Sequence, residues 1–419
     1  MTVLELLVLI VLFLKPIYSI LLTIFRIPVS SGQLGKIYLV IAIISYIFVF
    51  SKLIKNKLKT TKNFAKLIAI GLLFIFSSCL TFLIHNSINS NFYAEFLSYG
   101  SASICAMLLG YSLIRYGEMK KLGRMLPIII LSITITCFIT VLTGEKTYGL
   151  LNAQNNLDYQ NAAYYASYAL GLDLYYLFNY SEIIDSELLI KKKVIYYIMP
   201  VLQLFTVFSS GGRGGMILAL VIILYFAIQY IRQNDVKSKL SFILIFLLVI
   251  GIVYFFSIGR FGNQFGFKRL ESFLSNPFDS ERFRLMSTAY NGFKNSPIIG
   301  HGTGSIFYLM NIYSHNIFVD FIYEYGIIGF IILLLTILSV VKNMNRLTRM
   351  SSIYSFGILI FIYGITFLMF SAYYLSEQTI WFSLGFSLAC VEKNKVIDKE
   401  ENRNEKTAKN NCKIYPYTL

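Results

Sequence analysis

The chain has 419 residues, of which 56% are hydrophobic and only 14% are charged, and its mean hydropathy is +0.65. A soluble domain of this length cannot bury so much apolar surface, and soluble domains usually carry about 25% charged residues. These values exclude a soluble enzyme, a secreted disulfide scaffold and a disordered chain, and they predict an all-α polytopic membrane protein. The net charge of +16 does not indicate nucleic-acid binding, because cytoplasmic loops of membrane proteins collect basic residues for orientation.

Apolar runs long enough to cross a bilayer predict twelve transmembrane helices. They lie near residues 3–24, 37–54, 66–85, 93–114, 125–143, 162–179, 194–209, 214–231, 240–257, 317–341, 352–371 and 374–391. Lys15 and Asp173 fall inside spans, where a charge is costly and usually paired or functional. Each could face a cavity, pair with the other, or pair with Glu324, and the sequence does not choose between these alternatives.

Most of the 37 lysine and arginine residues fall in alternate connections between the spans. This alternation predicts that both termini are cytoplasmic. Residues 1–391 form the predicted transmembrane domain, and residues 392–419 are expected to be a disordered, charged cytoplasmic tail. The predicted external loop 258–315 departs from the pattern, because it carries six basic and three acidic residues. A long basic loop at the outer surface suits an anionic ligand, although its charges could also serve only solubility.

A glycine-rich stretch opens the eighth predicted span. Its sequence is Ser209-Ser210-Gly211-Gly212-Arg213-Gly214-Gly215. Glycine lets the backbone approach a ligand closely, and a helix N-terminus with an arginine suits phosphate oxygens. Ser210, Gly211, Gly212 and Arg213 are therefore predicted to form a pyrophosphate cradle, with a simple tight turn as the alternative.

A short helix on the membrane surface is expected in the external loop, capped by Asp279 or Ser280. Arg282 and Arg284 would lie near its N-terminal end. Its apolar residues recur at helical spacing and predict one apolar face, formed by Phe283, Met286, Tyr290 and Phe293. The alternative is a surface helix that only packs the loop down.

The tenth span is preceded by Ser314-His315-Asn316, with Ser314 as the expected N-cap. Asn316, Asp320, Tyr323 and Glu324 then follow at a spacing that places them on one polar stripe of a helix. His315 would lie at the external rim, where an imidazole can accept a proton from a hydroxyl. A lone histidine at a helix start is otherwise structural.

The sequence supplies no further chemical machinery. Three histidines are scattered and do not form a metal-binding set, and no cysteine pair has metal-ligand spacing. No phosphate-binding loop of the Walker type is present, so the chain is not expected to hydrolyse ATP. We therefore expect no metal and no cofactor.

The order of these motifs resembles the bacterial O-antigen polymerase and O-antigen ligase superfamily, which includes capsular polysaccharide polymerases. The glycine-rich stretch and Arg282 are followed by Pro297-Ile298-Ile299-Gly300-His301-Gly302, then Ser314-His315-Asn316 and Glu324-Tyr325-Gly326-Ile327-Ile328-Gly329. The resemblance is detailed over residues 200–335 and depends on the span count elsewhere. The chain departs from the family at the first arginine, where Gly211 and Gly212 stand in place of a Ser-x-Ser pattern.

This resemblance implies an all-helical glycosyltransferase on the outer face of the bacterial cytoplasmic (inner) membrane. Its donor would be a polyprenyl-pyrophosphate-linked oligosaccharide, with no nucleotide sugar or metal. Arg213 and Arg282 match arginines that hold the pyrophosphate, His315 matches the base, and Glu324 matches the acidic position of the signature. The substrate-binding set is completed by Ser210, Gly211, Gly212, Arg284 and Asn316.

The predicted function is a polysaccharide polymerase that joins lipid-linked repeat units. Its expected partners are the lipid-linked oligosaccharide, membrane lipids, a chain-length regulator and a flippase, with no nucleic acid. A glycan ligase would share the chemistry and the motifs. A lipid-linked oligosaccharide flippase or transporter is the alternative from a different class, and it would use Lys15, Asp173 and Glu324 as a coupling path.

Overall fold

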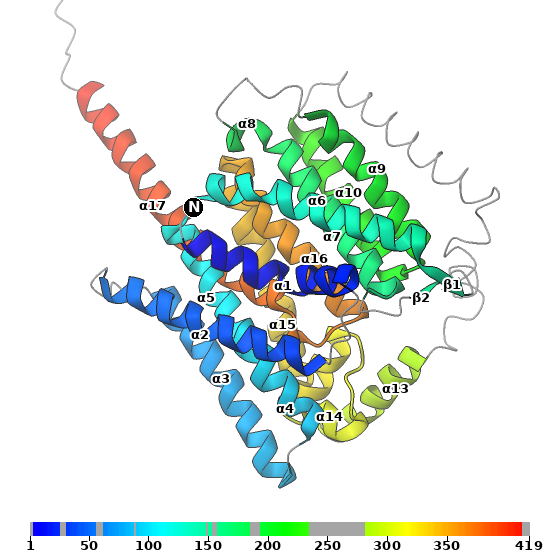
Figure 1. Ribbon diagram of the computed structural model, residues 1–419. Coiled ribbons are helices and arrows are strands. Elements are labelled where there is room, and N and C mark those ends of the chain that lie inside the picture. The colour runs from blue at the N-terminus through cyan, green and yellow to red at the C-terminus, as the bar shows by residue number, and fades with distance from the viewer. Residues whose placement is uncertain are drawn as a thin grey trace, which may run out of the picture.

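The computed structural model describes residues 3–25, 31–55, 62–87, 89–147, 150–152, 157–184, 193–233 and 281–412 (Figure 1). The described residues are helical except for turns and one small antiparallel hairpin, in which Glu145 lies opposite Asn152. The elements are α1 (Val3–Phe25), α2 (Ser31–Lys55), α3 (Lys62–His85), α4 (Ser90–Ala94), the π-helix η1 (Glu95–Gly100), α5 (Ser101–Tyr116), α6 (Met119–Thr143), β1 (Glu145–Thr147), β2 (Leu150–Asn152), α7 (Tyr159–Phe178), α8 (Tyr180–Ile183), α9 (Lys193–Ser210), α10 (Arg213–Gln233), α13 (Glu281–Phe293), α14 (Ser305–Met310), α15 (Ile317–Met350), the 3₁₀ helix η3 (Ser352–Tyr354), α16 (Ser355–Phe370), the 3₁₀ helix η4 (Tyr374–Ser376) and α17 (Gln378–Cys412).

Every predicted span that falls in the described residues coincides with a helix. Eight of these helices are long and apolar enough to cross a membrane. The chain is thus a multi-pass, all-α membrane protein, as predicted. The predicted span 240–257 and the first part of the external loop lie outside the described residues, so the count of twelve spans stays a prediction.

Close helix contacts at the centre of the bundle depend on glycine. On α5, a Cβ added at Gly110 would stand 2.2 Å from the carbonyl oxygen of Phe382 in α17, and one at Gly385 would stand 1.8 Å from that of Met107. The two backbones therefore touch, as small residues permit between membrane helices. A second buried helix, α7, packs against α6, α9, α10 and α16, and these helices form the part of the bundle that carries the site.

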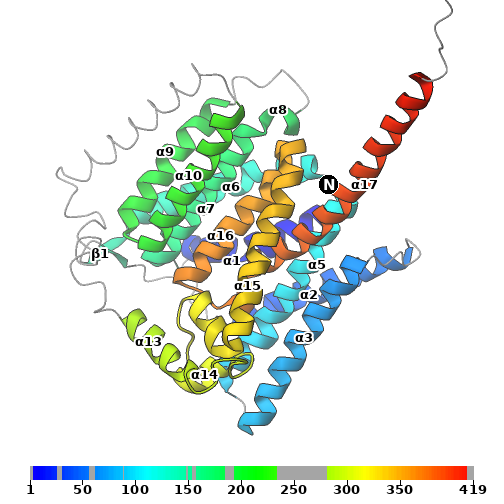
Figure 2. The same cartoon turned by 180° about the vertical axis from the view of Figure 1, so that it is seen from behind.

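The last helix departs from the sequence-based expectation. Residues after 391 were expected to be disordered, but α17 continues to Cys412 and projects away from the bundle (Figures 1 and 2). Arg115 of α5 pairs with Glu392 at 3.0 Å and holds the helix where it leaves the bundle. Extending a formed helix needs no new nucleus, and the Lys- and Glu-rich sequence has good helix propensity.

The structure shows the neighbours of Lys15 and Asp173, the two charged residues whose partners the sequence could not decide. Lys15 lies over the ring of Phe367, with 5.2 Å between its Nζ and the ring centroid, and it interacts electrostatically with Glu95 and Glu377. Asp173 instead lies against Gln203 of α9. Lys15 and Asp173 therefore lie beside different neighbours and do not pair with each other.

Candidate functional site

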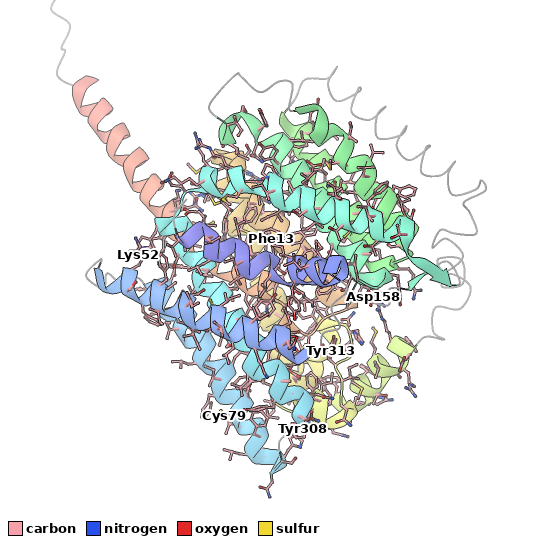
Figure 3. The ribbon with its side chains drawn as sticks, viewed as in Figure 1. Phe13, Lys52, Cys79, Asp158, Tyr308 and Tyr313 are labelled. Carbon is pink, nitrogen blue, oxygen red and sulfur yellow. The ribbon has the colours of Figure 1, made fainter. Side chains whose placement is uncertain are left out.

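A cavity of about 380 Å³ lies where α7, α10, α13 and the turn before α15 meet. Its lining residues are Tyr159, Gln160, Tyr164, Gly212, Arg213, Gly214, Glu281, Arg282, Leu285, Ile312, His315 and Ser371. Figure 3 labels Asp158, which caps α7, and Tyr313, which precedes α15, at this end of the bundle. Arg213, Arg282 and His315, predicted from separate parts of the sequence, are thus brought to one cavity.

Arg213 owes its position to the glycines around it. A Cβ at Gly212 would stand 2.6 Å from Ala163, one at Gly215 would stand 2.4 Å from the same side chain, and one at Gly214 would stand 1.9 Å from the Tyr164 hydroxyl. These glycines bring the start of α10 against α7. Their contacts are with protein, although Gly212 and Gly214 also line the cavity.

Arg282 is the second residue of α13, as predicted, and it is tied to α7. Its Nη2 donates to Oε1 of Gln160 at 2.9 Å, and Nε2 of Gln160 donates to the Tyr159 hydroxyl at 2.7 Å. The hydroxyl of Ser371 donates to that of Tyr164 at 3.1 Å. Sequence reasoning missed Gln160, Tyr164 and Ser371. Their signal was slight: a glutamine opening a tyrosine-rich span, and a serine following one.

The expected apolar face of α13 is only partly used for packing. Ala289 is the buried residue of this helix, whereas the Phe283 and Tyr290 side chains are 40% and 54% exposed. The predicted caps, Asp279 and Ser280, lie outside the described residues. A helix that packs through alanine and leaves aromatic rings uncovered fits the predicted position at a membrane surface.

His315 is held in an unusual backbone conformation just before α15. Its φ is +62°, a left-handed value that few non-glycine residues adopt. Oδ1 of the buried Asp320 accepts the backbone N–H of Ser314 at 2.9 Å. Oδ1 of Asn316 accepts from the N–H groups of Phe318 and Val319. Asn316 is therefore the N-cap, and the expectation for Ser314 is wrong, because the left-handed turn delays the helix start by two residues.

The surroundings of His315 keep its ring neutral. Burial of the imidazole, together with the nearby positive charge of Arg282, lowers the pKa of His315 to about 4, against the weaker opposing effects of the Ser371 backbone and Glu281. Its Nδ1 is buried and has no hydrogen-bond partner within the described part of the chain. A neutral imidazole with an unpartnered nitrogen can accept a proton.

The lowered pKa of His315 predicts how its chemical modification depends on pH. Above about pH 4 the ring is neutral, so its acylation by diethyl pyrocarbonate should stay constant from pH 5 to 8. In Arg282→Gln the repulsive charge is gone but burial, the larger cause, remains, so the pKa should rise only part of the way to its ordinary value and the reaction should slow at the acidic end of this range. Peptide-resolved mass spectrometry of the modified protein measures this. An unchanged profile in the variant would contradict the proximity of the two groups.

Several predicted site residues lie outside the cavity lining. The Arg284 side chain is 77% exposed and lies 3.7 Å from Glu281. Ser210 donates to the carbonyl of Val207 at 3.0 Å, and Gly211 makes the turn with a φ of +82°. Asn316 is occupied as the helix cap. These residues support the site and do not line it.

Glu324 also lies away from the cavity. Its carboxylate is fully buried and accepts hydrogen bonds from the hydroxyls of Tyr373 at 2.8 Å and Tyr374 at 2.5 Å. These two tyrosines follow Ser371, a residue of the cavity lining, by two and three positions along the chain. In this structure Glu324 can therefore position the chain behind Ser371, but it does not reach the space where a substrate would contact His315.

The glycine signature around Glu324 forms a break in α15. At Gly326 the backbone has a φ of 62° and a ψ of −163°, which leaves nearby N–H and C=O groups without helical partners. The loop 297–302 supplies these partners. The bonds run from His301 N to Tyr323 O (3.2 Å), Gly302 N to Glu324 O (2.7 Å), Ile327 N to Pro297 O (2.9 Å) and Ile328 N to Ile298 O (3.3 Å).

This junction has room only for glycine. A Cβ at Gly300 would stand 2.4 Å from the backbone of Glu324, and one at Gly326 would stand 2.3 Å from the carbonyl oxygen of Ile298. Both residues also have positive φ. The Pro-x-x-Gly-x-Gly and Glu-x-Gly motifs thus join the predicted external loop to the helix that follows His315.

Gly326→Ala should therefore destabilise the protein. Strain at a positive φ costs about 1–3 kcal/mol, and the clash with Ile298 adds to it. The thermal unfolding midpoint in detergent should fall by several degrees. Gly100→Ala is the matched control, because Gly100 is helical and the nearest atom to its Cβ would be 3.7 Å away. An equal midpoint for both variants would contradict the junction.

Comparison with known proteins gives a family match for the part of the chain that forms this cavity. No curated protein matches the chain. Residues 198–334 match the family model described as O-antigen ligase, a range that contains Arg213, Arg282, His315 and the break in α15 at Gly326. The chain is thus a multi-pass helical protein in which residues 198–334, about a third of its length, match the O-antigen ligase family over the part that brings two arginines and a neutral histidine to one cavity.

Proposed function

We propose that this protein is a polysaccharide polymerase that transfers a growing glycan from a polyprenyl-pyrophosphate carrier to a sugar hydroxyl of a second lipid-linked repeat unit. The family indicates activity of the O-antigen ligase or polymerase type. The observation that carries the proposal is the joint placement of Arg213, Arg282 and His315 on one cavity. Two fixed cations suit a pyrophosphate, and an uncharged imidazole suits a hydroxyl.

The glycosyl transfer needs only His315, the two arginines and the two lipid-linked substrates. The acceptor oxygen forms a bond to the anomeric carbon as its proton passes to His315. The bond from that carbon to the phosphate oxygen breaks, and the electron pair leaves with the polyprenyl pyrophosphate. Arg213 and Arg282 stabilise the charge that develops on the leaving group. The imidazolium then returns its proton to solvent or to the departing phosphate.

Gln160 supports this chemistry as a positioning residue. Its amide oxygen holds the Arg282 guanidinium at 2.9 Å, and its amide nitrogen is anchored on Tyr159. The arginine on the external helix is thereby fixed against α7 before a donor arrives. Such preorganisation lowers the cost of stabilising charge in the transition state.

The location follows from the same proposal. We place the protein in the bacterial cytoplasmic membrane, with both termini in the cytoplasm and the cavity on the outer side. A flippase would then deliver its substrate, and a chain-length regulator would act beside it. Cysteine accessibility to a membrane-impermeant reagent tests the orientation: a cysteine replacing Arg284 should be labelled in intact cells, and one replacing Lys120 should not.

A glycan ligase is the second candidate, since the matching family is described by that activity. Glycan size analysis in a strain lacking the gene separates the two. A polymerase predicts that single repeat units remain on the carrier or on the surface acceptor. Long chains stranded on the polyprenyl carrier would identify a ligase and overturn the polymerase assignment.

A further inference from the structure

A basic cleft lies at the end of α15 opposite His315, and the proposed reaction does not use it. The cleft has a volume of about 520 Å³ and lies between the last turns of α15 and the middle of α17. Its lining residues are Lys342, Asn343, Asn345, Arg346, Arg349, Val391, Asn394 and Lys395. Four of these eight side chains are cationic and none is acidic, so the cleft is suited to an anion.

Three of the four cations that line the cleft are Lys342, Arg349 and Lys395. Within the described ranges, no ion pair joins Lys342, Arg349 or Lys395 to an acidic side chain. Glu392 of α17 pairs with Arg115 at 3.0 Å. Asn394 is 5% exposed, and its Oδ1 has no hydrogen-bond partner among the described residues. The cleft therefore offers fixed positive charge and one buried acceptor.

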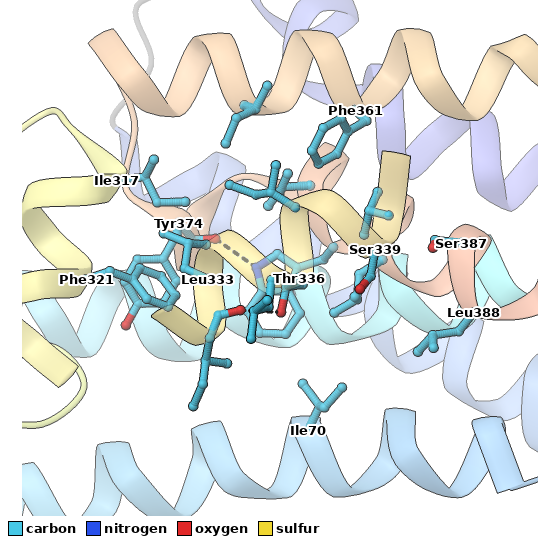
Figure 4. Close-up of a pocket in the computed structure, with 18 of the residues that line it drawn as sticks. Ile70, Ile317, Phe321, Leu333, Thr336, Ser339, Phe361, Tyr374, Ser387 and Leu388 are labelled. Atoms are coloured by element: carbon cyan, nitrogen blue, oxygen red, sulfur yellow. Dashed lines mark hydrogen bonds between the residues drawn. The ribbon is translucent and has the colours of Figure 1, made fainter. Parts of the chain in front are cut away.

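An apolar groove begins where this cleft ends. It also measures about 520 Å³, lies between α3, α15, α16 and α17, and shares Asn343 with the cleft. Figure 4 shows Ile70 of α3 facing Leu333 of α15, with Phe361 and Leu388 along the groove. Apart from Lys66 and a few hydroxyl and amide groups, its walls are hydrocarbon or aromatic. Such a surface at membrane depth suits an acyl chain.

We propose that the cleft and the groove together bind an anionic phospholipid with a hydroxylated headgroup, of the phosphatidylglycerol type. Lys342, Arg349 and Lys395 contact the phosphate, an acyl chain fills the groove, and a headgroup hydroxyl donates to Asn394. Membrane orientation accounts for basic residues at this end of α15. It does not account for their convergence on a cleft that continues into an apolar groove, which is the geometry of lipid-headgroup sites between helices.

The single tryptophan of the chain provides a direct test. Trp381 lines the groove, and its Nε1 donates to the carbonyl of Tyr374 at 2.8 Å. Bromine on an acyl chain quenches tryptophan at short range. In vesicles of unbrominated phosphatidylcholine, dibrominated phosphatidylglycerol should quench Trp381 at a mole fraction about tenfold lower than dibrominated phosphatidylcholine does. Equal quenching by the two lipids would overturn the proposal without any variant.

Two matched triple variants locate the preference. Lys342→Gln, Arg349→Gln and Lys395→Gln together should abolish it. Lys62→Gln, Arg232→Gln and Lys120→Gln remove the same charges from other helix ends and should leave it unchanged. A preference that survives in the cleft variant, or is lost equally in the control, would contradict the site. If the cleft triple does not fold, the single Lys342→Gln and Lys395→Gln variants replace it, and each should lower the preference about twofold to threefold.

Discussion

Replacing His315 by asparagine is expected to abolish long-chain glycan while leaving the protein in the membrane. Asparagine tolerates the left-handed backbone that His315 adopts, so the turn before α15 is preserved and only the imidazole is lost. Loss of a general base costs about 10²–10⁴-fold in rate. Glycan size analysis in a deletion strain carrying the variant measures the effect, and immunoblotting of the membrane fraction measures the protein.

His85→Ala is the control for this prediction. His85 is exposed at the end of α3 and stacks on Tyr308, with 4.0 Å between the ring centroids, and it does not line the cavity. We expect normal chain length from it. Long chains from His315→Asn at wild-type protein level would remove His315 from the mechanism.

Arg282→Ala is expected to be nearly as damaging as the histidine variant. One preorganised donor to developing charge is worth about 10²–10³-fold in rate. Arg282→Lys should recover only part of the activity, because an ammonium lacks the planar fork of donors with which a guanidinium can bind a phosphate while it donates to Gln160. The measurement is the initial rate of product formation from a purified lipid-linked repeat unit.

Arg284→Ala is the matched control for Arg282→Ala. Both arginines belong to the first turn of α13 and both substitutions remove one positive charge. Only Arg282 lines the cavity, whereas Arg284 is 77% exposed. We expect Arg284→Ala to retain most of the wild-type rate. Similar losses in the two variants would mean that the charge of the loop matters and that the position of Arg282 does not.

The sequence by itself determined the class of the protein and singled out three residues that the structure brings to one cavity. Composition fixes the membrane environment, because no soluble fold could bury this much apolar surface. Arg213 was recognisable because it follows glycines at the start of a span, Arg282 because it lies in a basic loop, and His315 because it precedes a polar stripe on a helix. The glycines at 300 and 326 were also recognisable as a motif, although their physical purpose was not.

The tertiary structure decided which groups meet. Gln160, Tyr164 and Ser371 reach the cavity because α7 packs under the start of α10 and beside the end of α16, and no local pattern encodes that contact. Glu324 shares a helical stripe with Asn316, yet the break at Gly326 and the hydroxyls of Tyr373 and Tyr374 hold it behind the cavity wall.

Lys15 also shows the difference between a property that the local sequence reveals and one that depends on distant segments. Its cost inside a span could be computed from the sequence, but its neighbours Glu95 and Glu377 come from segments far along the chain. Hydropathy and spacing are properties of neighbouring residues, so a sequence reveals them directly. The pairing of charges and the lining of a cavity depend on contacts between distant segments, and those contacts exist only once the helices have packed.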